Sequence, residues 1–141
     1  LVLTVQGACA GSARFVPGLA AFDPAQRDNP AACRMGQPGA FLITPLARKN
    51  PNYVGVPCAY RTVAEEYVPG QCGYRYDAVG GLSWGISYCV GVMALGWQVA
   101  PALTNEEMLQ TLLDTAAPNA DGLRIIDPVH FIETLEREYA S

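Results

Sequence analysis

The chain has 141 residues, of which 50% are hydrophobic and 16% are charged, and its formal net charge is −4. This balance is typical of a single globular domain with a real core and argues against a disordered chain. It also argues against a nucleic-acid partner, because the sequence holds no cluster of lysine and arginine residues that could neutralise phosphates.

The cysteines are odd in number, and no two of them form a C-x-x-C pair. They are Cys9, Cys33, Cys58, Cys72 and Cys89. With only one histidine in the chain, this pattern predicts neither a metal site nor a cofactor. Reduced thiols in a cytoplasmic protein are the interpretation we favour, and one or two disulfides with at least one thiol left free are the alternative.

The N-terminal part of the sequence predicts short strands joined by irregular segments. Residues 1–5 are β-branched and apolar, which predicts a buried strand. Residues 7–39 are rich in Gly, Pro, Asp and Asn and predict a long connection, a length that usually signals a functional or surface loop. Residues 40–44 predict a second strand and residues 53–56 a third, and a proline follows each of them.

Two further segments precede a glycine-rich turn in the middle of the chain. Residues 61–66 read as the start of a helix, which Pro69 and Gly70 would end. Residues 74–79 alternate in polarity, which predicts a strand or an extended approach to the glycine-rich turn.

Residues 84–99 carry apolar side chains on nearly every face of a helix. Such a helix is either central to a core or spans a membrane. The run is shorter than a typical span and is interrupted by Ser87, Gln98 and three glycines. We therefore expect a buried central helix and no membrane partner.

Two amphipathic helices are expected at the C-terminal end. Residues 103–107 form a capping box with a preceding hydrophobic residue, and they open a helix that reaches Ala116. A turn at 118–122 and a short extended segment at 123–126 lead to the last helix, which begins at the Asp-Pro pair 127–128. Its inward side chains are predicted to be Phe131, Ile132, Leu135 and Tyr139, and its outward ones Glu133, Glu136, Arg137 and Glu138.

Ser83 is the candidate functional residue. The glycines at 80–81 deliver it to the first turn of the expected helix, where backbone N–H groups are unpaired and the helix dipole favours negative charge. A serine in this place can attack a carbonyl carbon, and the N–H groups can hold the resulting oxyanion. The alternative is that Ser83 only caps the helix, which is the usual role of serine at a helix start.

The pentapeptide around Ser83 fits G-x-S-x-G and resembles the nucleophile elbow of α/β-hydrolases. In that family an aspartate and then a histidine follow the serine. The residues in that order here are Asp114, Asp121 or Asp127, and then His130. This resemblance implies an esterase-type hydrolase that uses Ser83, one of these aspartates and His130.

A second resemblance covers most of the chain. Residues 81–91 align without gaps with Gly-Thr-Ser-Met-Ala-x-Pro-His-Val-Ala-Gly, the motif that carries the nucleophile of subtilisin-like serine peptidases into a buried helix. The Ala-Leu pair at 94–95, Pro101, the capped helix start at 103–107 and the glycine turn at 122–128 then follow in the order of that family. Upstream, the chain is similar to a divergent bacterial branch in which Ser-Trp replaces Ser-Met.

The subtilisin-like resemblance implies an α/β fold: the C-terminal part of a three-layer structure with a mainly parallel sheet and the nucleophile, Ser83, on a buried central helix. Residues 1–141 would form a single partial domain. The catalytic aspartate and histidine precede the serine in this family, so an N-terminal part of the same peptidase would supply them, either upstream or as a separate cleaved chain. Residues 40–44 and 70–80 would border the substrate cleft.

The implied function is a serine endopeptidase that hydrolyses peptide bonds of a peptide or protein substrate through an acyl-enzyme on Ser83. The chain alone would lack activity. Two departures from the motif favour an alternative, a weak or inactive pseudo-peptidase that acts as a binding or regulatory module. Ser87 replaces the proline of the motif, and residues 6–12 lack the asparagine expected in the oxyanion hole.

Overall fold

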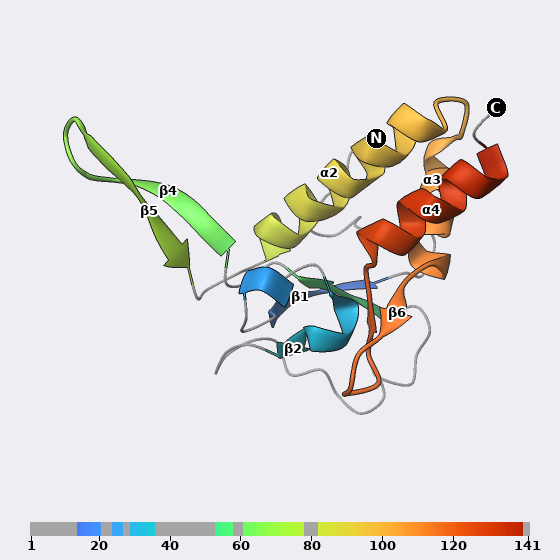
Figure 1. Ribbon diagram of the computed structural model, residues 1–141, viewed down its shortest axis with the longest axis horizontal. Helices are drawn as coiled ribbons and strands as arrows, with labels where there is room; N and C mark the ends of the chain where they lie inside the picture. Colours follow the sequence, from blue (N-terminus) through green and yellow to red (C-terminus); the bar gives the residue numbers. More distant parts are fainter. Residues whose placement is uncertain are drawn as a thin grey trace.

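The computed structural model describes residues 14–20, 24–26, 29–35, 53–57, 61–77 and 82–139. The strands predicted at 1–5 and 40–44 lie outside these residues. The described part is a small mixed α/β fold with two sheets and three α-helices (Figure 1).

The larger sheet is parallel at its centre and antiparallel at both edges. Its strands are β1 (Arg14–Ala20), β2 (Arg34–Met35), β3 (Tyr53–Pro57), β6 (Ala117–Pro118) and β7 (Arg124–Ile125). The strand order is β2-β1-β3-β7-β6, in which β3 runs parallel to β1 and β7, and the two edge strands are antiparallel to their neighbours. The predicted strand at 53–56 is therefore confirmed as the central strand, and the extended segment at 123–126 is confirmed as β7.

Strand β1 corrects the prediction of an irregular connection over residues 7–39. The Pro-Gly pair at 17–18, part of that predicted connection, lies inside the strand. The pairing of β1 with β3 shifts register between Val16 and Leu19, and such an irregularity accommodates a proline that cannot donate to the ladder. Two short 3-10 helices, η1 (Pro24–Gln26) and η2 (Pro30–Ala32), follow before β2.

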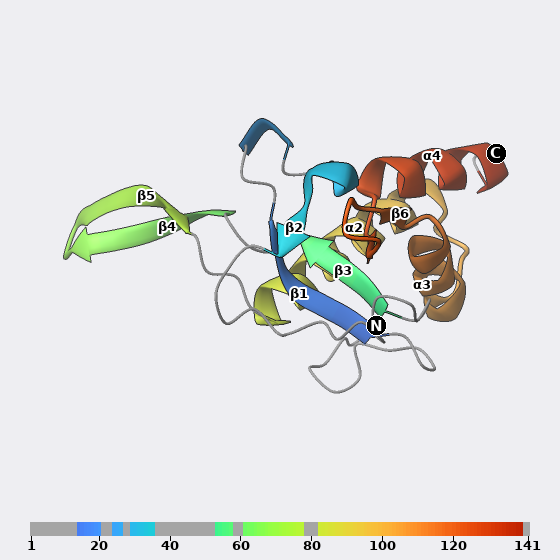
Figure 2. The same ribbon diagram turned by 90° about the horizontal axis from the view of Figure 1, so that it is seen from below.

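A β-hairpin replaces the helix start predicted at 61–66. Strand β4 (Arg61–Val68) pairs antiparallel with β5 (Gln71–Asp77) across the Pro-Gly pair 69–70. Gly70 has a φ of +81°, the conformation that a type II turn requires after proline. The prediction of an extended segment from residue 74 is confirmed as far as Asp77, and the hairpin extends away from the rest of the structure (Figures 1 and 2).

The three helices lie on one side of the larger sheet (Figures 1 and 2). They are α2 (Leu82–Val99), α3 (Asn105–Asp114) and α4 (Pro128–Tyr139). Helix α2 packs against β1, β3 and both other helices, and the main core lies between them. The largest fully buried side chains of this core are Phe131, Met93, Met108, Leu112, Ile126, Leu135, Val54 and Val56.

The predicted helix starts and faces are confirmed with one exception. Thr104 accepts a hydrogen bond from the Glu107 N–H, and the Glu107 carboxylate accepts one from the Thr104 N–H, which completes the capping box of α3. Phe131 and Leu135 are buried in α4 as predicted. Tyr139 is 45% exposed, so its predicted inward position is wrong, because the packed face ends one turn earlier.

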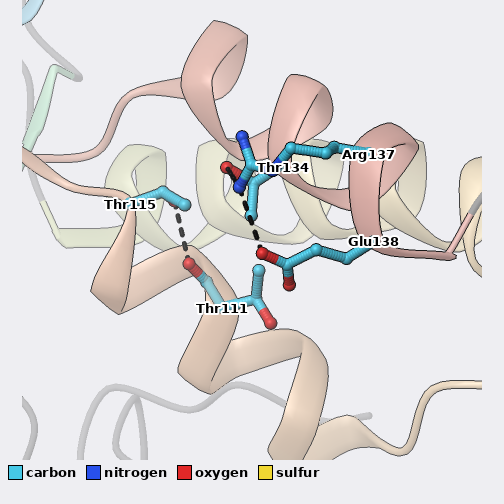
Figure 3. Close-up of polar contacts among 5 residues, drawn as sticks. All are labelled: Thr111, Thr115, Thr134, Arg137 and Glu138. Atoms are coloured by element: carbon cyan, nitrogen blue, oxygen red, sulfur yellow. Dashed lines mark hydrogen bonds and ion pairs between the residues drawn. The ribbon is translucent and has the colours of Figure 1, made fainter.

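Two threonines are buried where α3 meets α4 (Figure 3). The Thr115 hydroxyl donates to the Thr111 carbonyl at 2.8 Å, and Arg137 donates to the Thr134 hydroxyl at 3.5 Å while it also contacts Glu138 at 3.1 Å. Both buried hydroxyls are thus satisfied within this helix pair, so their burial carries little cost.

Candidate functional site

Ser83 is the second residue of α2, since this helix begins at Leu82. A capping serine stands before the first helical residue, so the position of Ser83 inside the first turn differs from that of an N-cap. The backbone N–H groups of this turn have no partner within the helix, and they lie at the positive end of its dipole. The chain therefore places a serine where an oxyanion would be stabilised. Its side chain lies outside the described part of the structure.

The buried face of α2 fixes the helix that carries this serine. A Cβ atom added to Gly96 would lie 2.6 Å from Met108 Sδ and 2.6 Å from Phe131 Cζ, so α3 and α4 approach α2 closely at this glycine. The Trp97 indole N–H donates to the Leu103 carbonyl at 3.0 Å, which holds the turn between α2 and α3. The C-terminal half of α2 is thus anchored on both following helices.

The opposite face of α2 is exposed and uncharged. We call it the α2 outer face; its residues are Trp84, Ser87, Val90, Gly91, Ala94, Leu95 and Gln98. Trp84 and Leu95 are each 49% exposed. The prediction of a helix buried on all sides is wrong for this face, because the described elements supply packing partners on one side only. An uncharged stripe over four turns is unusual for a helix that faces water.

His130 lies far from Ser83. Its neighbour in the sequence, Phe131, packs its ring against Gly96 of α2. At the rise of an α-helix, Gly96 lies about 20 Å along α2 from Ser83. The His130 ring nitrogen Nδ1 lies 3.0 Å from the Thr115 carbonyl oxygen. The structure therefore does not bring this histidine to the serine.

The three aspartates considered as partners belong to the same distant region or to local turns. Asp127 accepts a hydrogen bond from the His130 N–H at 3.1 Å and thereby caps α4. Asp114 accepts one from Gln110 at 2.8 Å at the end of α3. Asp121 lies in the β6–β7 turn, where its N–H donates to Asn119. Each has a structural environment that accounts for it without chemistry.

Asn119 is a buried residue that the sequence reasoning missed. Its side-chain oxygen accepts hydrogen bonds from the Asp121 and Leu123 N–H groups, both at 2.9 Å, and its amide donates to the Cys33 carbonyl at 3.0 Å. These bonds satisfy the side chain within the turn, so Asn119 organises the sheet edge rather than an active site. The Asn-Ala-Asp-Gly run at 119–122 marks a turn in the sequence, but the contact of Asn119 with Cys33 has no sequence signal.

Within the ranges given above, no group of three His, Cys, Asp or Glu side chains is arranged to hold a metal ion. Among the helices described, none combines the length and the apolar character needed to cross a membrane. Residues 6–12, where the subtilisin-like resemblance implies an oxyanion-hole asparagine, lie outside the described residues.

Comparisons with models of protein families, with curated proteins and with solved structures find no match to this chain. The fold is therefore assigned from the structure alone, as the mixed α/β arrangement described above.

Proposed function

We propose that the chain is the C-terminal part of a subtilisin-like serine endopeptidase in which Ser83 is the nucleophile. The observation that carries this proposal is the place of Ser83 in the first turn of a long apolar helix that begins directly after the glycines at 80–81. The parallel centre of the sheet and its cover of helices support a subtilisin-like three-layer arrangement. The second helical layer would come from residues beyond those described.

The α2 outer face supports a larger domain. Uncharged helix faces of this length are usually covered by other polypeptide. In the proposal, the N-terminal part of the peptidase packs there and brings the catalytic aspartate and histidine to Ser83. Trp84, next to Ser83, would then lie at the boundary between the two parts.

The proposed reaction is peptide-bond hydrolysis in two steps. The supplied histidine removes the proton from Ser83 Oγ as the oxygen attacks the carbonyl carbon of the substrate. The tetrahedral oxyanion accepts hydrogen bonds from the N–H groups of the first turn of α2. The histidine then donates its proton to the leaving amine, the acyl-enzyme forms on Ser83, and water releases the acid by the same route.

A pseudo-peptidase is the second candidate, because residues 6–12 contain no asparagine and loss of one oxyanion-hole donor typically lowers the rate about 10²–10³-fold. The protein would then keep the fold as a binding or regulatory module. An esterase that pairs Ser83 with His130 is not proposed, because about 20 Å of α2 separates Ser83 from Gly96, where Phe131, the neighbour of His130, packs.

The test is labelling with a fluorophosphonate probe, followed by mass-spectrometric mapping, on protein isolated together with its N-terminal part. A covalent adduct on Ser83 is expected, and Ser83→Ala should abolish it. Ser87→Ala is the matched control, since Ser87 lies one turn further along the same helix and is exposed. His130→Ala should leave the adduct unchanged. A protein that carries its N-terminal part and gives no adduct on Ser83 is a pseudo-peptidase.

A further inference from the structure

The β4–β5 hairpin, which we call the arm, has no other strand beside it in the part of the chain that the structure describes. Both views show it extending from the body (Figures 1 and 2). An isolated two-stranded hairpin is only marginally stable in water. Further strands beside the arm would therefore stabilise it.

The two edges of the arm differ in their ability to take another strand. The β4 edge contains a register irregularity between Glu66 and Val68 and leads directly into Pro69. Bulges and prolines are features that prevent edge pairing. Strand β5 contains no proline, and its pairing with β4 is regular from Cys72 to Asp77. The arm thus has one protected edge, on β4, and one open edge, on β5.

A single open edge favours a second copy of this chain as its occupant. A strand from an unrelated protein, once added to β5, would present a new open edge on its own far side. A second copy that pairs its β5 with this β5 leaves a four-stranded sheet with a protected β4 strand at each side. This pairing is isologous, so it closes at two chains.

Strand β5 is also complementary to itself. It runs from residue 71 to residue 77, so a two-fold axis at Tyr74, its middle residue, pairs the whole strand antiparallel. The two Tyr74 side chains then stand opposite each other, and each has the small Ala64 as its partner on β4. Aromatic pairs across neighbouring strands stabilise a sheet. Tyr74 is 79% exposed in the single chain, which leaves its ring accessible for this contact.

The charges of the arm fit the same register. Arg75 of one copy lies opposite Gly73 of the other, and the β4 partner of Gly73 is Glu65. The Tyr67 ring covers Gly73, where an added Cβ would lie 2.6 Å from the ring. The guanidinium of Arg75 therefore meets an aromatic ring and a carboxylate of the second copy, and both groups attract a cation. An axis at Arg75 itself would instead set two like charges opposite each other, which is destabilising.

From these observations we infer that two copies of this chain form a dimer through their β5 edges, in an antiparallel register centred on Tyr74. Seven paired residues make an edge about 24 Å long. A contact of this size is smaller than a standard interface, so we expect a weak dimer with a Kd on the order of 10–100 µM. The dimer is independent of the proposed function, because its axis lies on the arm.

Sedimentation velocity of the full chain tests the dimer, in reducing buffer and at concentrations on both sides of that Kd. Tyr74→Lys places two like charges at the axis and should raise the Kd about tenfold or more. Val68→Lys is the matched control: it adds the same charge to an exposed position of the protected strand, and it should change the Kd by no more than about twofold.

Oxidative cross-linking tests the register, with mass-spectrometric mapping of the bonded thiols and with Cys72→Ser as the background. Residues directly opposite each other in antiparallel strands have Cα atoms about 4.5–5.5 Å apart, which a disulfide spans. Tyr74→Cys should therefore cross-link two copies. Ala64→Cys is the control, since it lies on the same face one strand further from the axis and should give no cross-link.

Three outcomes would each overturn the inference: a monomer at every concentration, equal effects of the two lysine variants, or a cross-link through Ala64→Cys. A fourth concerns the other possible occupant of the edge. If the N-terminal part slows hydrogen exchange of the β5 amides in a complex that holds a single copy of this chain, the edge belongs to that part and the inference is wrong.

Discussion

Gly96 offers the sharpest test of how α2 is held, and it has a control in the same helix. In Gly96→Ala, the new methyl group would lie 2.6 Å from Met108 Sδ and 2.6 and 2.8 Å from two Phe131 ring atoms. Met108 and Phe131 are fully buried, so neither has open space to move into. In Gly91→Ala, by contrast, the methyl group would meet nothing within 4 Å.

The two variants should change stability in opposite directions. Overpacking a core costs about 1–3 kcal/mol, and three short contacts place Gly96→Ala towards the upper part of that range. Replacing glycine by alanine in a helix interior returns about 1 kcal/mol. We therefore expect Gly96→Ala to lose about 1–2 kcal/mol and Gly91→Ala to gain about 0.5–1 kcal/mol.

Urea denaturation followed by circular dichroism measures both changes, with unchanged m-values as the check that the transition remains the same. Phe131→Leu removes the ring atoms that the new methyl group meets, so the penalty of Gly96→Ala should fall by about 1 kcal/mol in that background. If Gly96→Ala proves as stable as Gly91→Ala, the close approach of α3 and α4 to α2 is refuted.

Three other predictions follow from the described contacts. Asn119→Ala should cost about 1–2 kcal/mol in urea denaturation, because it removes the acceptor of the Asp121 and Leu123 N–H groups, the second of which is buried. The Cys33 carbonyl keeps its hydrogen bond from Arg34 at 2.9 Å. The hydrogen bonds from the Thr104 N–H and then the Thr104 hydroxyl hold the pKa of Glu107 below its ordinary value. The stability that Glu107 contributes is therefore present above the ordinary glutamate pKa and lost as the pH falls through the lowered one, and Glu107→Gln should remove this pH dependence from melting curves. Leu95→Lys should change the free energy of unfolding of this chain by no more than about 0.5 kcal/mol, since the residue is exposed. It should prevent co-purification of the N-terminal part with this chain. Assembly that survives the substitution would contradict the role given to the α2 outer face.

The sequence predicted the three α-helices well and located β3, β5 and β7, but it missed β1 and gave the start of β4 as a helix. The capping box at Thr104 and the Asp127 cap of α4 are contacts between residues close in the chain, so their signals are local. The Pro-Gly pair at 17–18 lies in the segment predicted as an irregular connection, and the pair at 69–70 is predicted to end a helix. The first lies within a strand at a register shift, and the second joins the two strands of a hairpin. In both places the outcome depends on a partner strand that the local pattern does not specify.

Some features of the candidate site likewise follow from the local sequence, and others depend on the tertiary structure. The sequence by itself determined that a serine follows a glycine pair at the start of a long apolar helix, because glycine conformation and helical periodicity act within a few residues. Only the tertiary structure decided that one face of this helix is exposed, that His130 lies beside Thr115 at the other end, and that β4 and β5 form an arm before the serine. These features depend on which distant segments pack together, and burial of apolar surface on one side of α2 selects that packing.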